Sequence, residues 1–359
     1  MNPDFQRLMN EATRLTRTGD LQAATAAIQA ALGGVPAAPP PANEARDVID
    51  VEAREVPGYP PADLEVETPL AYVDVPVPHG RFVAGSFADA AGRRDYKLYV
   101  PPGAGERPLP LVVMLHGCTQ DPDDFSAGTA MNDAALAQGF FVLYPAQSRQ
   151  ANPQGCWNWF KHSHQKRGRG EPALLAGMTR EVMAQHAIDP RRVYVAGLSA
   201  GGAMAAILGE AYPDLYAAVG VHSGLAAGVA SDLPAALMAM QRGGTQAGGG
   251  SSGMPTIVFH GDADATVHAS NGDQVIAASV GKTTSVEVEH LQAKGGRGST
   301  RRLHRSADGR VVAEHWKVHG APHAWSGGSA KGSYTDVRGP DASAEMLRFF
   351  FDHPRQPAH

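Results

Sequence analysis

The chain of 359 residues has only two cysteines, Cys118 and Cys156, too few for a disulfide-dense scaffold or for a zinc site built from its own thiolates. It also has no excess of basic charge. The chain has 31 Lys and Arg against 36 Asp and Glu, and this formal net charge of −5 indicates no basic surface for nucleic acid. No apolar run approaches the ~20 residues of a membrane-spanning helix, so we expect no membrane span.

The first residues lack the charged and apolar regions of a signal peptide. As written, the chain is therefore expected in the cytoplasm. A chain whose signal peptide had been removed would look the same, so secretion stays open.

The first 63 residues predict two accessory segments. Apolar residues at helical spacing, broken at Gly19-Asp20, predict a small helical hairpin over residues 1–32, which we expect to pack on the main domain or on a partner. Residues 33–63 are rich in Pro and Ala without apolar periodicity, which predicts a linker. This division leaves residues 64–352 for the main domain and 353–359 for a C-terminal tail.

The main domain reads as alternating strands and helices after a strand-rich start. This order predicts an α/β fold with a mostly parallel central sheet and helices on both faces. The glycine-rich residues 243–253 predict a flexible surface loop. We expect strands near residues 70–75, 81–87, 94–100, 111–117, 140–144, 217–222, 256–260, 286–291 and 311–318, and helices near 129–138, 173–186, 200–208 and 341–351.

The sequence Gly197-Leu198-Ser199-Ala200-Gly201 joins a β-branched run to a strong helix former. Gly-x-Ser-x-Gly between a strand and a helix is the nucleophile elbow, a turn so tight that a Cβ at either glycine would be strained. We therefore predict that Ser199 is a nucleophile. A glycine turn with an incidental serine is the alternative, and the flanking strand and helix disfavour it.

A serine nucleophile needs an imidazole base and a carboxylate that orients the imidazole. In hydrolases with a nucleophile elbow the chain order is serine, then the acid, then the histidine. Asp264 follows the apolar run 256–260 in a Gly-x-x-Asp-x-x-Val spacing that resembles the pattern of other hydrolases. We therefore choose it over Asp262, which we expect to accept backbone amides in the same loop. For the base we choose His323, on the loop before the last helix. His315 and His319, within or at the end of the preceding strand, are expected to pack or to face solvent.

The remaining histidines are expected at the surface or behind the site. His222, at a strand end beside Ser223, is the one that could reach the site.

Acyl transfer also requires N–H donors for the oxyanion. We predict the amides of Ala200 and Cys118, with the Gly117 peptide as the near alternative for the second; a tight turn without such a role is the remaining interpretation.

Cys118 and Cys156 lie on loops expected at the same sheet edge. A disulfide between them would brace the oxyanion loop in an oxidising compartment, and two free thiols are the alternative. Aromatic residues follow Cys156 and His323 and could line a cleft for an acyl or aryl group, although core packing is equally consistent with them. The candidate cleft residues are Trp157, Trp159 and Trp325, with Phe160 beside them.

Five motifs occur in order: residues 115–120 (LHGCTQ), 156–160 (CWNWF), 189–202 (DPRRVYVAGLSAGG), 260–264 (HGDAD) and 323–328 (HAWSGG). Together they resemble the polyhydroxybutyrate (PHB) depolymerase family of esterases, whose relatives include feruloyl and acetylxylan esterases. The resemblance covers about residues 81–351. It implies an α/β-hydrolase fold, no metal or organic cofactor, and Ser199, Asp264 and His323 as the catalytic triad.

The sequence therefore predicts a serine esterase that forms an acyl-enzyme on Ser199. The expected substrates are a polyhydroxyalkanoate or another polyester, or short-chain esters; feruloyl or acetylxylan ester hydrolysis is the alternative. A peptidase, an acyltransferase or a non-catalytic binding module are the further hypotheses.

Overall fold

The computed structural model describes residues 79–244, 251–280, 285–293 and 295–356. The chain divides into two units, Met1–Val73 and Asp74–His359, and every described residue belongs to the second. The predicted helical hairpin, the linker, the strand near 70–75 and the end of the tail lie outside the described residues, as do residues 245–250 of the glycine-rich loop.

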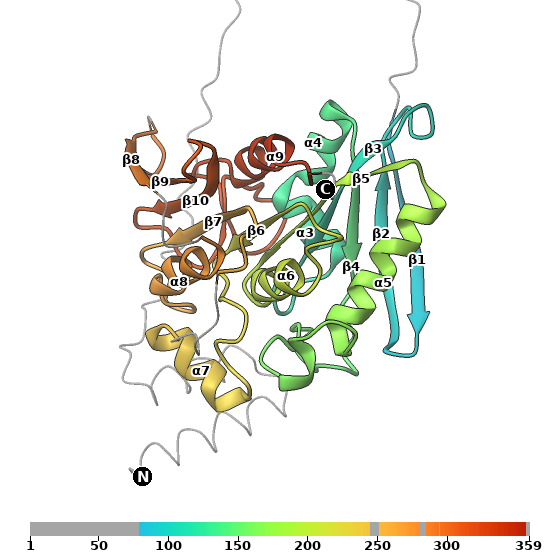
Figure 1. Ribbon diagram of the computed structural model, residues 1–359, viewed down its shortest axis with the longest axis horizontal. Helices are drawn as coiled ribbons and strands as arrows, with labels where there is room; N and C mark the ends of the chain where they lie inside the picture. Colours follow the sequence, from blue (N-terminus) through green and yellow to red (C-terminus); the bar gives the residue numbers. More distant parts are fainter. Residues whose placement is uncertain (1–78, 245–250, 281–284, 294, 357–359) are drawn as a thin grey trace, which may run out of the picture. The chain divides into compact units, whose positions relative to one another are not determined.

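The described chain forms one ten-stranded sheet with the order β1-β2-β4-β3-β5-β6-β7-β10-β9-β8 (Figure 1). Six neighbouring strands, β4 to β10 in that order, run parallel, while β1, β2, β9 and β8 pair antiparallel at the two ends. The strands are β1 (Arg81–Asp89), β2 (Gly92–Val100), β3 (Leu109–Leu115), β4 (Phe141–Pro145), β5 (Ile188–Leu198), β6 (Ala218–His222), β7 (Thr256–Gly261), β8 (Ser285–Leu291), β9 (Ser299–Arg305) and β10 (Val311–Val318), with β11 (Trp325–Ser326) and β12 (Thr335–Asp336) as a separate pair.

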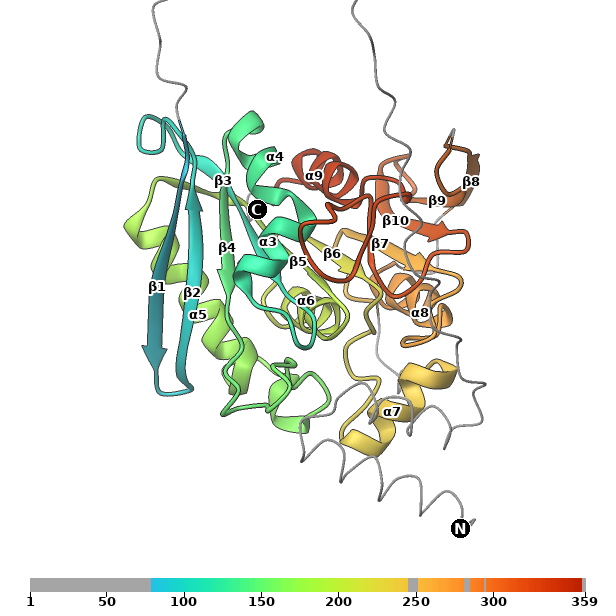
Figure 2. The same cartoon turned by 180° about the vertical axis from the view of Figure 1, so that it is seen from behind.

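Helices cover both faces of this sheet, as Figures 1 and 2 show from opposite sides. Side chains of α5, α6, α7 and α8 share one apolar cluster, and those of α3, α4 and α9 share the other. The predicted α/β architecture is therefore confirmed. The helices are α3 (Pro122–Thr129), α4 (Met131–Gln138), α5 (Gly170–Gln185), α6 (Ala200–Ala211), α7 (Leu233–Arg242), α8 (Ser270–Ser279) and α9 (Ala342–Asp352), with a 3₁₀ turn at His162–His164.

Strand β3 shows why the sheet is buried on both faces. Its residues Leu111, Val113 and Leu115 belong to the cluster under α5 and α6, whereas Val112 and Met114 belong to the opposite cluster. Because side chains of a strand alternate between faces, a run that is apolar throughout suits a strand with helices on each side.

The sequence did not predict three helices and one strand of the main sheet, α3, α7, α8 and β9, nor the short pair β11 and β12 and the 3₁₀ turn. Strand β9 is rich in arginine and has no apolar run, so the sequence pattern did not indicate a strand. In the structure, Arg301 and Arg305 bond to Glu289 and Glu287 of β8. Cross-strand pairs of opposite charge stabilise such an edge. The helix predicted near 129–138 is α4, and Ala130, with φ of 51°, separates it from α3.

Candidate active site

Ser199 occupies the turn between β5 and α6 and has φ of 57° and ψ of −118°, a strained conformation for a residue with a side chain. The turn is as tight as the glycine spacing predicts. A Cβ on Gly197 would lie 2.4 Å from the carbonyl carbon of Gly201, and a Cβ on Gly201 would lie 2.0 Å from the carbonyl oxygen of Leu115. The amide of Ser199 donates to the carbonyl of His222 at 2.9 Å, which holds the turn.

Asp264 and His323 come together from the loops after β7 and β10. Nδ1 of His323 lies 2.7 Å from Oδ2 of Asp264, and Oδ1 of Asp264 accepts the amides of Thr266 and Val267, each at 2.8 Å. Burial alone would raise the pKa of Asp264, but the contacts with His260 and His323 and the Val267 amide hold it well below its usual range. The carboxylate therefore keeps the proton of His323 on Nδ1 and leaves Nε2 as an acceptor.

The other candidate acid and bases lie apart from this pair. Asp262 accepts the amide of Gly320 at 2.6 Å and contacts Nδ1 of His319 at 3.2 Å, both on the surface. His315 is buried and faces Asp273 instead.

Two cavities meet at Ser199. The smaller, of about 280 Å³, is lined by Ser199 and His323, and the larger, of about 420 Å³, extends past Ala200. No hydrogen bond joins Ser199 to His323 in the described part of the chain; such contacts often tighten only when substrate binds. Both cavities are also lined by Cys118, Gln154 and Met240.

The amides of the loop after β3 are not equally free. The Gly117 amide donates to Oε1 of Gln120 at 3.0 Å, and the Thr119 amide donates to the carbonyl of Gln154 at 2.8 Å. Among residues 117–119, only the Cys118 amide has no hydrogen-bond partner within the described ranges. The Ala200 amide lies in the first turn of α6, where the helix itself provides no acceptor. These positions favour Cys118 over Gly117 as the second oxyanion donor.

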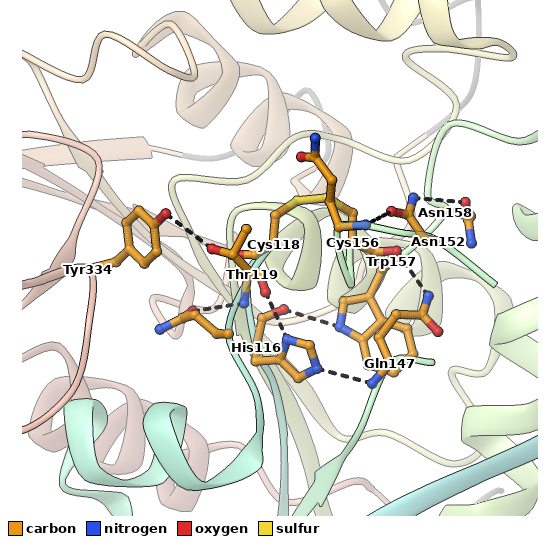
Figure 3. Close-up of a disulfide and its surroundings, with 12 residues drawn as sticks. His116, Cys118, Thr119, Gln147, Asn152, Cys156, Trp157, Asn158 and Tyr334 are labelled. Atoms are coloured by element: carbon orange, nitrogen blue, oxygen red, sulfur yellow. Dashed lines mark hydrogen bonds between the residues drawn. A yellow bond between two sulfur atoms is a disulfide. The ribbon is translucent and has the colours of Figure 1, made fainter. Parts of the chain in front are cut away.

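The predicted disulfide is present: Cys118 and Cys156 are bonded, with their Cα atoms 4.2 Å apart (Figure 3). It joins the loop after β3 to residues 147–160. His116 strengthens the same junction, because its Nε2 accepts the amide of Gln147 at 3.1 Å and its carbonyl accepts Nε1 of Trp157 at 3.1 Å. Burial lowers the pKa of His116, so its imidazole is neutral and can accept.

A buried carboxylate, which the sequence analysis missed, anchors residues 147–160. Glu171 of α5 accepts the amide and side chain of Asn158, both at 2.7 Å, and the side chain of Gln147 at 2.6 Å. Burial raises the pKa of Glu171, but these bonds and the contact with His164 lower it by more than burial raises it. Glu171 therefore stays charged. Its neighbour Cys156 is thereby held against the candidate oxyanion loop.

We predict that breaking the disulfide weakens both fold and site. The bond closes a loop with a sequence separation of 38, for which the chain-entropy model gives about 4 kcal/mol of stability. Cys156→Ser combined with Cys118→Ser should lower the Tm by roughly 10 °C, since about 2–4 °C is expected per kcal/mol. Differential scanning calorimetry, with dithiothreitol on wild type and on the double variant, checks this. A wild-type Tm insensitive to reductant would contradict it.

The tryptophans predicted for the cleft divide between cavity and core. Trp159 and its neighbour Phe160 line the larger cavity. Trp157 is fully buried and donates to His116, and Trp325 is buried against Phe125 and donates to Oγ of Ser343. The cleft positions expected for Trp157 and Trp325 are therefore wrong, because an indole N–H that is buried needs an acceptor and both rings have found one in the core.

His222 lies behind the site rather than on a cavity wall. Its Nε2 accepts the amide of Ser326, three residues after His323, at 2.9 Å, and its ring stacks 5.0 Å from Trp325. Since its carbonyl also accepts the Ser199 amide, this residue ties the nucleophile turn to the histidine loop. Burial, and then the neighbouring His260 and His323, lower its pKa to about 3.

We predict that His222 makes the fold acid-sensitive. Its folded pKa of about 3 lies below the ~6.5 of an unfolded histidine, so the unfolded state gains protons first. Stability is full above about pH 6.5 and is lost as the pH falls towards 3, by about 2 kcal/mol at pH 5. Urea unfolding at pH 7.5 and 5.0 measures this loss. His222→Gln, which keeps an acceptor but does not titrate, should lose about 2 kcal/mol less; equal losses would contradict the prediction.

Tyr334 and α7 also contribute to the site without having been predicted. The Tyr334 backbone has φ of 51°, its hydroxyl lies 3.1 Å from Oγ1 of Thr119, and its side chain lines the smaller cavity. From α7, Leu233, Leu237 and Met240 line the larger cavity. No motif marks these residues, since the fold brings them from distant parts of the chain.

In the described ranges, no helix is long and apolar enough to cross a bilayer. The same ranges contain no group of three or more His, Cys, Asp or Glu side chains placed to hold a metal ion.

The sheet order, the elbow and the order of Ser199, Asp264 and His323 define an α/β-hydrolase. The fold is shared with an acetyl xylan esterase from Aspergillus awamori, with a TM-score of 0.56 at 18% identity over 75% of this chain and 99% of that one. Residues 94–288 match the family model for esterase PHB depolymerase. The chain belongs to this family.

Two relatives show the range of the family. The chain is 31% identical to poly(3-hydroxyalkanoate) depolymerase C of Paucimonas lemoignei over 251 residues, which are 66% of this chain and 60% of that protein. It is 32% identical to feruloyl esterase B of Thermothelomyces thermophilus over 151 residues, 42% of this chain and 50% of that protein. The matches thus span only half to three fifths of these relatives' lengths.

Proposed function

We propose that this protein hydrolyses carboxylic esters through an acyl-enzyme on Ser199. The observation that carries the proposal is the 2.7 Å contact between His323 and Asp264 beside the strained serine turn, with both Ser199 and His323 on one cavity. Family membership supports the same chemistry.

In this mechanism Nε2 of His323 takes the proton of the Ser199 hydroxyl as it attacks the ester carbonyl. Asp264 holds the imidazole in the required tautomer and stabilises its charged form. The amides of Ala200 and Cys118 donate to the oxyanion, each contributing roughly 3 kcal/mol to the transition state. His323 then protonates the leaving alcohol, and water repeats the sequence on the acyl-enzyme.

We assign one half of the ester to each of the two cavities. His323 lines only the smaller one, so the alcohol that it protonates leaves through that side. The larger cavity receives the acyl group, against Trp159, Phe160, Leu225 and Val267. With about 280 and 420 Å³ on either side of Ser199, a hydroxyacyl unit has room on both sides.

We therefore propose a polyhydroxyalkanoate or a related polyester, including its short soluble oligomers, as the substrate class. The similarity to the Paucimonas lemoignei depolymerase favours this choice. A feruloyl ester is the second candidate, because an aromatic acyl group would suit the apolar wall of the larger cavity and a feruloyl esterase is among the relatives.

A matched ester panel tests the proposal: p-nitrophenyl acetate, butyrate and octanoate, methyl ferulate, a 3-hydroxybutyrate trimer and a polyhydroxybutyrate film, each with Ser199→Ala as the control. We expect hydrolysis of the trimer and of short p-nitrophenyl esters that is lost in the variant. Preference for methyl ferulate over the trimer would replace the polyester by the feruloyl ester. Absence of any Ser199-dependent hydrolysis would contradict the proposal.

A further inference from the structure

The peptide group between His116 and Gly117, in the loop after β3, is fixed at both ends. Its carbonyl accepts Nε1 of Trp157 at 3.1 Å (Figure 3), and its amide donates to Oε1 of Gln120 at 3.0 Å. Trp157 and Gln120 are both buried. Since a buried peptide group rarely gives up its hydrogen bonds, the loop enters the site in one orientation.

The peptide group between Cys118 and Thr119 is fixed in the same way. Its carbonyl accepts the Thr119 hydroxyl at 2.6 Å, and its amide donates to the carbonyl of Gln154 at 2.8 Å. Because the hydrogen of the Thr119 hydroxyl is used in this bond, the Tyr334 hydroxyl, 3.1 Å away, donates to the same oxygen. Thr119 has φ of 67°, which is rare for a β-branched residue, so these bonds stabilise a strained position.

The peptide group between these two, from Gly117 to Cys118, carries the predicted oxyanion donor. Its carbonyl lies 2.7 Å from Nδ1 of His116. Nε2 of His116 accepts the amide of Gln147 at 3.1 Å, and since a backbone amide only donates, this nitrogen carries no hydrogen. Burial lowers the pKa of His116, so the ring is neutral and its one hydrogen is on Nδ1. Nδ1 therefore donates to the Gly117 carbonyl.

This bond also determines where the Cys118 N–H points. A peptide group is planar and trans, so its N–H is directed opposite to its C=O. Of the carbonyls and amides in these three peptide groups, only the Cys118 N–H has no hydrogen-bond partner in the described part of the chain. Gly117, Cys118 and Ser199 line the same cavity, so the one unbonded amide lies beside the nucleophile.

We propose that His116 is a positioning residue of the oxyanion hole, because its hydrogen bond to the Gly117 carbonyl aims the Cys118 amide at the oxyanion. This role rests on the proposed function, since it belongs to the same acyl-transfer step. Hydrogen bonds in series polarise one another, so the bond also makes the Cys118 N–H a stronger donor. His116 acts through the peptide group and not on the substrate: it is 2% exposed and lines neither cavity at Ser199 in the described structure.

The first test is made on the unaltered protein. Long-range ¹H–¹⁵N spectra near pH 7, assigned by the signals lost in His116→Asn, should show a neutral His116 with its hydrogen on Nδ1. A crystal structure of the adduct between Ser199 and a trifluoromethyl ketone should place the oxyanion within about 3.1 Å of the Cys118 amide nitrogen, with the Gly117 carbonyl still on His116. A hydrogen on Nε2, or a peptide group that turns away from His116 in the adduct, would overturn the proposal.

The second test separates the two ring nitrogens of His116. Asparagine places its amide nitrogen near the position of Nδ1 and keeps the donor to Gly117, whereas glutamine places its oxygen near Nε2 and keeps the acceptor for Gln147. We expect His116→Gln to lower kcat for p-nitrophenyl butyrate about 10- to 100-fold, part of the loss caused by removing an oxyanion donor, with KM changed less than twofold. His116→Asn should keep kcat within about threefold of wild type.

A purely structural role would give a different pattern. Each variant gives up one of two buried bonds, so both should lose stability, and kcat should fall only in His116→Gln. The inhibition constant of the trifluoromethyl ketone, an analogue of the tetrahedral intermediate, should rise in His116→Gln by the factor by which kcat falls. Equal losses of kcat in the two variants, or a larger loss in His116→Asn, would refute the positioning role. If either variant does not fold, the adduct structure of the unaltered protein decides.

His164→Gln serves as the matched control. His164 contacts Glu171 at 3.5 Å, within the anchor of residues 147–160, but bonds to none of the three peptide groups. It should leave kcat within twofold. If hydrolysis did not depend on Ser199, the proposed function would fail whatever the tautomer of His116. If hydrolysis depends on Ser199 while His116→Gln keeps its kcat, only the role of His116 fails.

Discussion

Ser199→Ala should lower kcat for p-nitrophenyl butyrate by about 10⁵-fold, with little change in KM. The expected loss is this large because the hydroxyl forms the covalent bond, and removal of a serine nucleophile abolishes the contribution of the whole triad. Initial rates under saturating substrate measure it. The Tm should stay within a few degrees, since alanine removes only one oxygen.

Ser223→Ala is the matched control for this change. Ser223 also follows a parallel strand and also has a positive φ, of 48°, but it lines neither cavity at Ser199. We expect it to lower kcat less than tenfold. Equal losses in the two variants would mean that disturbance of the strand ends, and not loss of a nucleophile, explains the result.

Asp264→Asn should lower kcat by about 10⁴-fold. Its amide group would donate to Nδ1 of His323, so the imidazole would carry its hydrogen on Nε2, where it cannot take the proton of Ser199. The backbone bonds from Thr266 and Val267 to the side-chain oxygen are retained, which keeps the loop in place. Steady-state kinetics of the folded variant measure the effect.

Asp262→Asn makes the same change two residues earlier in the loop. Asp262 contacts His319 and Gly320 at the surface rather than His323, so we expect kcat to change less than threefold. A larger loss from Asp262→Asn than from Asp264→Asn would reverse the assignment of the triad acid.

The sequence was sufficient to predict the parts of the site that depend on local geometry. The glycines around Ser199 mark a turn that only they can form, and the backbone contacts at Gly197 and Gly201 show the same crowding. The spacing after β7 separated Asp264 from Asp262, and the structure brings Asp264, but not Asp262, to His323. In each case a few neighbouring residues determine the outcome.

What escaped prediction depends on distant contacts. An aromatic residue beside a motif can face a cavity or the core, and only the packed fold shows that Trp159 lines the cavity while Trp157 and Trp325 do not. Tyr334 reaches Thr119 across 215 positions of the chain. Glu171 reads as an ordinary acidic residue near a helix start, and its burial against Asn158 could not be seen from the sequence.

The covalent step at Ser199 is the central claim, and a fluorophosphonate probe tests it most directly. Intact-mass and peptide-mapping spectrometry should show one adduct per chain, located on Ser199, that forms at least about a hundredfold more slowly in His323→Ala. An adduct on another residue, or no adduct on a folded chain that hydrolyses the ester panel, would contradict the account.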